Sequence, residues 1–348
     1  MASLLIGRAS SAAFWCSQTS LRPSLLLPKA VSRVAISSSP LLSTRQRAAG
    51  FATVKKTKAA AAFPEKKMIN DHILTLSCPD KPGIVHNVTG LLAKQGLNIL
   101  DLQQFSDPAS DRFFMRVHFG HAENTESLKE PFTVLAKDLQ MDYEIHPVAQ
   151  KPRVLIMVSK IGHCLNDLLF RFKTQQLAID IPVIVSNHPE YRALAESYGI
   201  EFHHLPVTKD TKAEQESQIL ALIEQQKIEL VVLARYMQVL SPKLCEVMSG
   251  KIINIHHSFL PSFKGAKPYH QAFERGVKII GATAHFVTAD LDEGPIIEQR
   301  VARVDHAMSP KELVEEGSNV ESQVLAAAVK WWSEKRVFLN GTKTVVFN

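Results

Sequence analysis

The chain has 348 residues, of which 45% are hydrophobic and 21% charged, a composition typical of globular proteins and sufficient for two domains. Its net charge of +6 does not indicate a nucleic-acid partner, because residues 1–64 hold nine lysines or arginines and no acid, which leaves 31 basic and 34 acidic residues elsewhere. No apolar run approaches the roughly 20 residues of a membrane span, and four scattered cysteines without a C-x-x-C pair indicate neither a disulfide framework nor a zinc site.

Residues 1–64 have the composition of an organelle transit peptide, rich in serine, alanine and arginine and free of acid. We expect this segment to be disordered and to direct the chain to the mitochondrial matrix, with the plastid as second choice. The preference rests on "QRAAGF", where Arg47 precedes a plausible cleavage region. A secretory signal is disfavoured, because no long apolar core follows Arg8. A basic tail without a targeting function is the alternative.

Residues 70–147 predict a small domain with the order βαββαβ, the order of the ferredoxin-like fold. Apolar segments indicate its four strands, and apolar residues at helical spacing indicate its two helices. In chain order the elements are expected at 71–79, 83–96, 97–105, 111–119, 126–139 and 141–147.

The first turn of this domain reads "CPDKPGIV" and resembles the opening of ACT domains, small regulatory modules that bind amino acids or related metabolites, usually between paired copies. The resemblance implies an effector site at Asp80, Lys81 and Gly83, and it implies a homo-oligomer. Gly83 would let a ligand approach the backbone N–H groups at the start of the helix. The alternative is that this turn only caps the helix and that the domain only dimerises.

A short linker at 148–152, flanked by Pro147 and including Pro152, leads into a second domain at 153–348. There, all-apolar strands alternate with helices, which is typical of a Rossmann-like, mostly parallel sheet with helices on both faces. The predicted fold class is therefore α/β, with a ferredoxin-like domain in front. Strands are expected at 153–159, 181–187, 201–207, 229–236 and 252–258.

Polar residues follow the strands of this second domain at the carboxyl ends, where ligands bind in open α/β sheets. "RYMQVL", residues 235–240, follows one strand, and Asn254 and His256 close the next. "GATAHFVTADLDEGPII", residues 281–297, carries His285 and Asp292 at the end of a third strand. A lone histidine beside a strand is usually structural, but the joint occurrence of these segments indicates a catalytic pocket.

The same residues carry a resemblance to the formyltransferase family that uses 10-formyltetrahydrofolate. Its members share N-x-H at a strand end followed by S-x-L-P, and H-x₆-D-x-G further downstream. Here the motifs are formed by Asn254, His256 and "SFLP", and by His285, Asp292 and Gly294. The ACT-like domain in front, and His257 where the transferases commonly have proline, are similar to the hydrolytic members, the deformylases. The resemblance implies C–N hydrolysis of 10-formyltetrahydrofolate to tetrahydrofolate and formate in one-carbon metabolism, without a metal or cofactor.

Removal of a formyl group passes through a tetrahedral oxyanion, so the site needs a hydrogen-bond donor, a proton carrier and an oriented water. By the resemblance, Asn254 would donate to the formyl oxygen, and His256 would assist the oxyanion and carry a proton towards the leaving N10. Asp292 would orient the water and take its proton. His285 would support Asp292, and His257 would help to hold the water or only pack against the site.

The segment "LARYMQVLSP" resembles the pterin-binding segment of the family, in which loop backbone groups contact the pterin ring and apolar side chains flank it. The loop 288–294 would complete the pterin wall. Val239 and Leu240 also fit an ordinary role in the core. The implied folate-binding residues are Arg235, Tyr236, Met237, Val239, Leu240, Thr288 and Gly294.

Formyl transfer to glycinamide ribonucleotide in purine synthesis is the main alternative. It is disfavoured because the turn after the first strand has one glycine, Gly162, beside bulky neighbours and supplies few N–H groups for a phosphate. Formylation of initiator tRNA is disfavoured because no basic RNA-binding domain is evident. A folate or amino-acid sensor without turnover is the third possibility. Zinc shared by an adjacent pair, His256 with His257 or His203 with His204, is disfavoured because neighbours on a regular strand point to opposite faces.

Overall fold

The computed structural model describes residues 70–120, 125–208, 210–262 and 268–348. The predicted transit peptide, residues 1–64, lies outside the described residues. The domain boundaries predicted at 70–147, 148–152 and 153–348 stay predictions. Within the described ranges, no helix combines the length and the apolar composition that a bilayer crossing takes.

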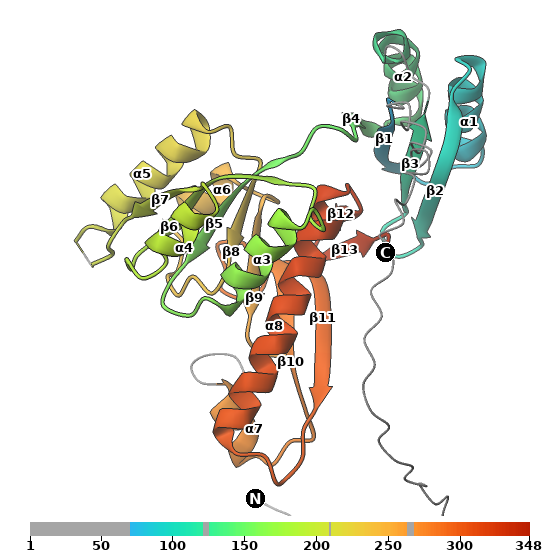
Figure 1. Ribbon diagram of the computed structural model, residues 1–348. Helices are drawn as coiled ribbons and strands as arrows, with labels where there is room; N and C mark the ends of the chain where they lie inside the picture. Colours follow the sequence, from blue (N-terminus) through green and yellow to red (C-terminus); the bar gives the residue numbers. More distant parts are fainter. Residues whose placement is uncertain (1–69, 121–124, 209, 263–267) are drawn as a thin grey trace, which may run out of the picture. The chain divides into compact units, whose positions relative to one another are not determined.

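The first part of the described chain contains a four-stranded antiparallel sheet with the order β2-β3-β1-β4 and two helices (Figure 1). This confirms the predicted βαββαβ order. Gly83 is the residue before α1 and has φ 92°, a left-handed conformation that favours glycine; a Cβ there would meet only Asn87, at 3.9 Å, so the conformation and not the space requires glycine. The elements are β1 (His72–Pro79), α1 (Ile84–Lys94), β2 (Asn98–Asp107), β3 (Arg112–Gly120), α2 (Glu126–Leu139) and β4 (Asp142–Pro147).

The second part contains a seven-stranded sheet with the order β11-β10-β9-β8-β5-β6-β7 (Figure 1). The neighbours from β9 to β7 in this order pair in parallel, whereas β10 runs antiparallel to both β9 and β11. The mostly parallel sheet is thus confirmed. Its strands are β5 (Arg153–Val158), β6 (Asp180–Ser186), β7 (Glu201–His204), β8 (Leu230–Leu233), β9 (Ile252–His256), β10 (Ile279–Phe286) and β11 (Ile296–Arg303).

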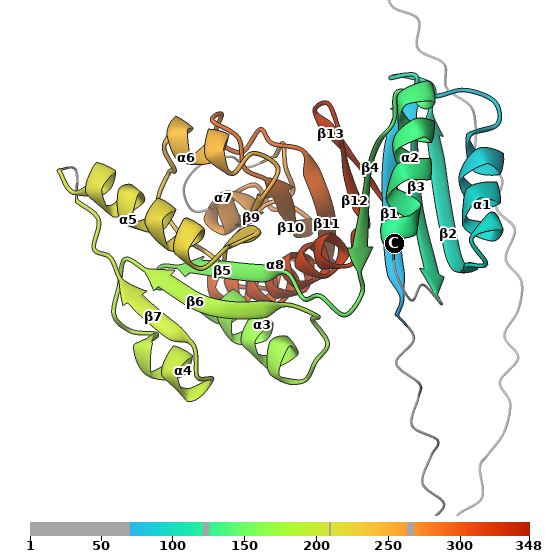
Figure 2. The ribbon, with the colours of Figure 1, turned by 90° about the horizontal axis from the view of Figure 1, so that it is seen from above.

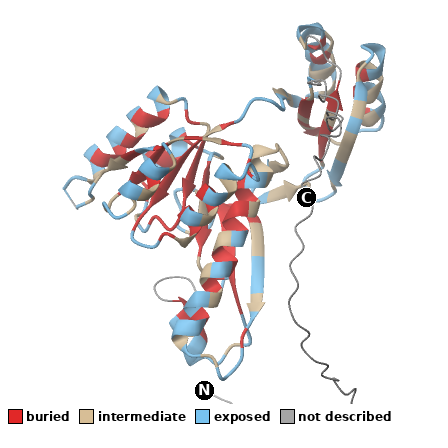
Figure 3. Cartoon of the chain, in the orientation of Figure 1, coloured by how far each residue is buried: buried red, intermediate tan, exposed pale blue. Residues whose placement is uncertain are grey.

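Helices cover both faces of this sheet, as Figure 2 shows. Along β5, Ile156 packs in one cluster with residues of α3 and α8, and its neighbour Met157 packs in the other with residues of α5 and α6. The inner strands β5, β6, β8, β9 and β10 are buried along most of their length, the edge strands β7 and β11 are not, and α8 is buried along one side (Figure 3). Burial on both faces explains why the inner strands are mostly apolar. The helices are α3 (His163–Lys173), α4 (Arg192–Ser197), α5 (Lys212–Gln225), α6 (Pro242–Val247), α7 (Pro268–Glu274) and α8 (Pro310–Ser333), and a hairpin of β12 (Val337–Asn340) and β13 (Lys343–Val346) follows.

The direction of β10 corrects one prediction. The segment 281–297 was expected to end at the same edge as β9, but β10 pairs antiparallel, with His285 opposite Asn254 and Phe286 opposite Ile253. The carboxyl end of β10 therefore points to the other edge of the sheet. Strand pairing brings His285 beside Asn254, and the loop that follows β10 folds back to bring Asp292 to His256.

Candidate active site

A pocket of about 670 Å³ lies beside the end of β9. Its walls come from the loop after β8, from β9 and β10, from the loop after β10, and from α7 and α8. Gly294 is the one residue predicted for catalysis or folate binding that does not line it. The predicted residues that it brings together are Arg235, Tyr236, Met237, Val239, Leu240, Asn254, His256, His257, His285, Thr288 and Asp292.

His256 and Asp292 form a hydrogen-bonded pair, with 3.1 Å between His256 Nδ1 and Asp292 Oδ1. Because a carboxylate accepts, Nδ1 carries the hydrogen and Nε2 is left with a free lone pair in the neutral ring. Nε2 is buried and has no hydrogen-bond partner among the described residues. The hydrogen bond from His256 is the main cause that lowers the pKa of Asp292, against the effect of burial. The pair thus offers one unoccupied ring nitrogen to the pocket.

His285 forms a hydrogen bond with the side chain of Asn254. Its Nδ1 lies 2.8 Å from the backbone oxygen of Phe286, so Nδ1 carries the hydrogen and Nε2 accepts one. The Nδ2 group of Asn254 lies 3.2 Å from that Nε2 and donates to it, which fixes which end of the amide is the NH₂. Burial lowers the pKa of His285 and keeps the ring neutral.

The sequence-based role of His285 therefore needs revision. Its Nε2 is 3.8 Å from Asp292 Oδ1, and a neutral ring whose only hydrogen is on Nδ1 cannot donate to that carboxylate. The contact with Asn254 is shorter and has the correct donor and acceptor. His285 orients the amide of Asn254 and leaves its second N–H available.

Gly294 has a packing role. A Cβ on this residue would overlap the backbone oxygen of Phe286, which is the same oxygen that accepts from His285. Glycine therefore permits the close approach of the loop that carries Asp292 to the end of β10. This close contact between the loop and Phe286 explains why the motif has glycine at position 294.

His257 lies just beyond the last residue of β9, so the rule for regular strands does not apply to it. Its ring centroid is 5.2 Å from that of His256, and both rings line the same pocket. The geometric reason for excluding a shared ion was therefore wrong, although His256 Nδ1 is already occupied by Asp292. Burial, together with the charge of Arg235, lowers the pKa of His257 to about 4. The expected absence of a metal stays a prediction.

The predicted folate-binding residues divide into two groups. Met237 and Val239 are each 55% exposed and line the pocket, so they provide an apolar rim. Leu240 and Tyr236 are buried in the core, so the role in the core is confirmed for Leu240 and is absent for Val239. The backbone N–H of Met237 donates to Ser159 Oγ at 3.0 Å, which positions the loop after β8.

A second cluster in the pocket was missed by the sequence analysis. Glu321, on the buried side of α8, is 1% exposed. Its Oε1 accepts from the Tyr269 hydroxyl at 2.6 Å, and its Oε2 accepts from His163 Nε2 at 2.9 Å. Burial alone would raise the pKa of Glu321, but the bond from His163 and the charge of Arg235 outweigh it and lower the pKa. A signal existed: Glu321 occupies an apolar position of α8, four residues after Gly317 and three before Val324.

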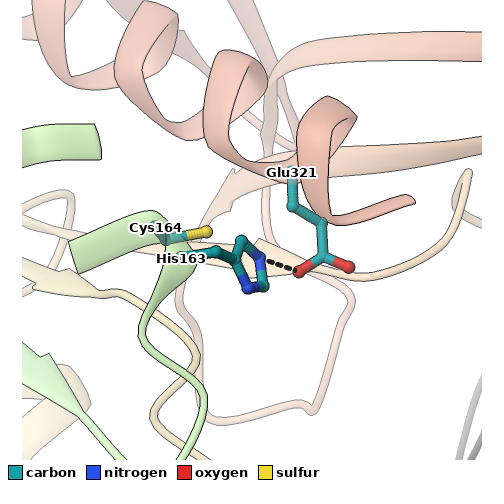
Figure 4. A group of neighbouring side chains, drawn as sticks. All are labelled: His163, Cys164 and Glu321. Carbon is teal, nitrogen blue, oxygen red and sulfur yellow. Dashed lines mark hydrogen bonds and ion pairs between the residues drawn. The ribbon is translucent and has the colours of Figure 1, made fainter. Parts of the chain in front are cut away.

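His163, Cys164 and Glu321 also place possible metal ligands within 4.8 Å of one another. Figure 4 shows the His163 ring directed at the Glu321 carboxylate, with the hydrogen bond that joins them. Burial strongly raises the pKa of the Cys164 thiol, and a protonated thiol is a poor ligand. Hydrogen bonds account for this group without an ion.

The candidate effector residues lie in the turn between β1 and α1. Lys81 and Gly83 are exposed, and Asp80 is partly exposed. The backbone N–H of Asp80 donates to the oxygen of Asp111 at 3.0 Å, and its carboxylate accepts from Ser106. The turn is thus held at its first residue and open to solvent at its last.

Comparisons with known proteins identify the family of both parts of the chain. The sequence model of the formyl transferase family matches residues 152–329, and that of the ACT domain matches residues 72–136. Formyltetrahydrofolate deformylase of Corynebacterium sp. (strain P-1) is 53% identical over 278 residues, which cover 79% of this chain and 97% of that protein. The crystal structure of formyltetrahydrofolate deformylase from Burkholderia mallei is 55% identical, with a TM-score of 0.77, and covers 80% of this chain and 100% of that chain.

Phosphoribosylglycinamide formyltransferases are less similar. The crystal structure of the enzyme from Anaplasma phagocytophilum is 31% identical, with a TM-score of 0.52, and covers 57% of this chain and 96% of that chain. The similarity to the deformylases is higher and extends over nearly their whole length. This chain therefore belongs to the formyltetrahydrofolate deformylase family.

Proposed function

We propose that this chain hydrolyses 10-formyltetrahydrofolate to tetrahydrofolate and formate, with Asn254, His256 and Asp292 as its catalytic residues. The observation that carries the proposal is their convergence in one pocket: an oriented amide, a histidine with an unoccupied ring nitrogen, and the carboxylate that holds this histidine. The apolar rim at Met237 and Val239 suits the flat pterin ring. Neither a cofactor nor a metal is needed for this chemistry.

The geometry favours His256 over Asp292 as the base that activates water. The hydrogen bond that Asp292 accepts from His256 lowers the pKa of Asp292, so this carboxylate is a weak base. The free Nε2 of His256 would take the proton from water as the water oxygen bonds to the formyl carbon. Asp292 would then stabilise the resulting imidazolium, as the carboxylate does in a Ser-His-Asp triad.

The proton balance of the reaction follows from this assignment. The free N–H of Asn254 would donate to the formyl oxygen as its negative charge develops. When the tetrahedral intermediate collapses, the C–N10 bond breaks and His256 would return its proton to N10. The collapse releases tetrahydrofolate and formic acid, which gives up its remaining proton to water to become formate, and His256 is neutral again.

Hydrolysis is favoured over transfer to glycinamide ribonucleotide. The similarity to the deformylases extends over both domains, whereas the transformylase neighbour covers 57% of this chain. The turn after β5 also remains poor in glycine, and a Cβ on its one glycine, Gly162, would overlap the ring of Tyr191. That glycine is thus explained by packing and not by a phosphate.

The test is release of formate from 10-formyltetrahydrofolate by the full chain without any added amine acceptor. We expect turnover by the parent, a fall in kcat of about 10²–10³ for Asn254→Ala, and a fall of roughly 10³–10⁴ for Asp292→Asn. Asp305→Asn is the matched control, because it makes the same change on an exposed residue that does not line the pocket, and it should leave the rate unchanged. Formate release that required glycinamide ribonucleotide would reassign the chain to the transferases, and folate binding without turnover would favour a sensor.

We also propose that residues 1–64 direct the chain to the mitochondrial matrix. Their basic, acid-free composition supports this, and the family matches begin only at residue 72. A fluorescent protein fused behind residues 1–64 should enter mitochondria, and replacing the basic residues of the segment by glutamine should abolish import. Diffuse or plastid fluorescence of the parent fusion would contradict mitochondrial targeting.

The ACT domain supports a further proposal, that the chain is a homo-oligomer which binds an amino-acid effector at Asp80, Lys81 and Gly83. The open turn at Gly83 supports access to this site. Light scattering and thermal shifts measured with the twenty amino acids would test both parts. A monomer that no amino acid stabilises would contradict them.

A further inference from the structure

Arg235 has an unusual backbone for a buried residue with a long side chain. It follows β8, lines the catalytic pocket and is 8% exposed. Its φ is 64°, a left-handed conformation that is unfavourable for any residue with a Cβ. Such strain persists only when the surroundings impose it, and it concentrates at functional sites. We therefore asked what the guanidinium contacts.

Glu321 neutralises the charge of Arg235 but does not satisfy its donors. Arg235 Nε lies 3.4 Å from Glu321 Oε2, an ion pair without hydrogen-bond geometry, whereas His163 and Tyr269 donate hydrogen bonds to this carboxylate. Neither Nε nor Nη1 of Arg235 has a hydrogen-bond partner within the described ranges. Buried donors without partners are costly, and a bound ligand is one of the few explanations for them.

The two donors without partners select an anion as the ligand. They are N–H groups of a fixed cation, and charge-assisted hydrogen bonds to carboxylate oxygens are among the strongest that such groups make. The proposed hydrolysis produces a carboxylate small enough for a buried position, formate, and produces it in the same pocket. Formate is an anion formed in the pocket that both Asp292 and Arg235 line, so the charge of Arg235 would stabilise it there.

We propose that Arg235, held by Glu321, forms a carboxylate subsite that binds the formate product. The subsite deepens the proposed hydrolysis and rests on it for the identity of its ligand. The glutamyl tail of the folate substrate is the other source of a carboxylate. This tail is bulky and charged, so it is more stable in solvent than against the Arg235 side chain, which is 92% buried. Formate is therefore the ligand that the structure favours.

The test uses sodium formate alone, without folate, so binding is measured independently of turnover. The full chain is titrated by calorimetry and by thermal shift. We expect saturable binding by the parent and at least a tenfold weaker affinity for Arg235→Lys, which keeps the charge but loses the N–H groups of the guanidinium. A double variant, Arg235→Met with Glu321→Gln, removes both charges together and avoids leaving Glu321 buried without its cation. It should lose binding as well, while circular dichroism reports whether it is folded.

The control is Lys243→Met, which removes an exposed cation from α6 and should bind formate like the parent. Absence of formate binding by the parent, or equal binding by the parent and a folded Arg235 variant, would overturn the proposal. A shift with p-aminobenzoylglutamate that depends on Arg235, without one for formate, would assign the subsite to the substrate tail and overturn it too. Turnover is assayed separately: a parent that binds formate but releases none from 10-formyltetrahydrofolate would retain the subsite and refute the hydrolysis.

Discussion

The two buried histidines of the pocket differ in which nitrogen faces the reaction. In His256 the carboxylate of Asp292 binds Nδ1 and leaves Nε2 free. In His285 the backbone oxygen of Phe286 binds Nδ1, and Asn254 occupies Nε2. His285 has no free nitrogen for proton transfer, so it positions the amide, and His256 is the one of the two that can accept a proton.

At this scale the sequence could predict residues that lie in motifs. Asn254, His256 and Asp292 were predicted because they match motifs of the family that the sequence resembles, at the ends of apolar strands. Glu321 could not be assigned a role in this way, because its partners Tyr269 and His163 come from distant parts of the chain. The contact of His285 with Asn254 was not predicted, because hydrogen-bond direction depends on a backbone oxygen that a motif does not reveal.

Helix α8 contributes residues both to the pocket and to the hydrophobic core. It begins at Pro310, after a capping box in which Ser309 and Glu312 exchange hydrogen bonds, and it extends to Ser333. Gly317 lies in its interior, where glycine is less favourable than alanine by about 0.5–1 kcal/mol. The ring of Tyr269 explains why glycine is required at this position, because a Cβ on Gly317 would overlap that ring.

We therefore predict that Gly317→Ala lowers stability in spite of its higher helix propensity. The added methyl group displaces Tyr269 and weakens its bond to Glu321, at a cost of about 1–3 kcal/mol. The matched control is Gly90→Ala in α1, where a Cβ would meet nothing within 4 Å. That variant should gain about 0.5–1 kcal/mol. Thermal unfolding of the full chain compares the two, and a Gly317→Ala variant more stable than the parent would contradict the account.

The elements themselves were predictable from periodicity, but strand direction was not. The apolar strands of the sheet and the order βαββαβ follow from patterns of local residues. An apolar strand such as β10 fits either direction, and the pairing with β9 that selects one is a contact between distant segments. The final hairpin had a local signal, since Gly341 and Thr342 separate β12 from β13 and Gly341 has φ 61°.

On the scale of the whole molecule, burial of histidine near a fixed cation makes stability depend on pH. Burial and the charge of Arg235 lower the pKa of His257 from 6.5 to about 4. Between these values the unfolded chain binds a proton that the folded chain does not. Stability therefore falls as the pH falls through this range, because it rises with pH wherever the unfolded state binds more protons. The pocket thus contributes to acid sensitivity of the fold.

We predict that His257→Gln removes this part of the acid sensitivity. From the two pKa values, His257 should cost the parent about 2 kcal/mol of stability between pH 7 and pH 5. Urea unfolding of parent and variant at both pH values measures the difference, and other titrating groups cancel because both proteins share them. The free energy of unfolding of the variant should thus fall less on acidification than that of the parent. Equal losses in the two proteins would mean that His257 is protonated as readily in the folded chain as in the unfolded one.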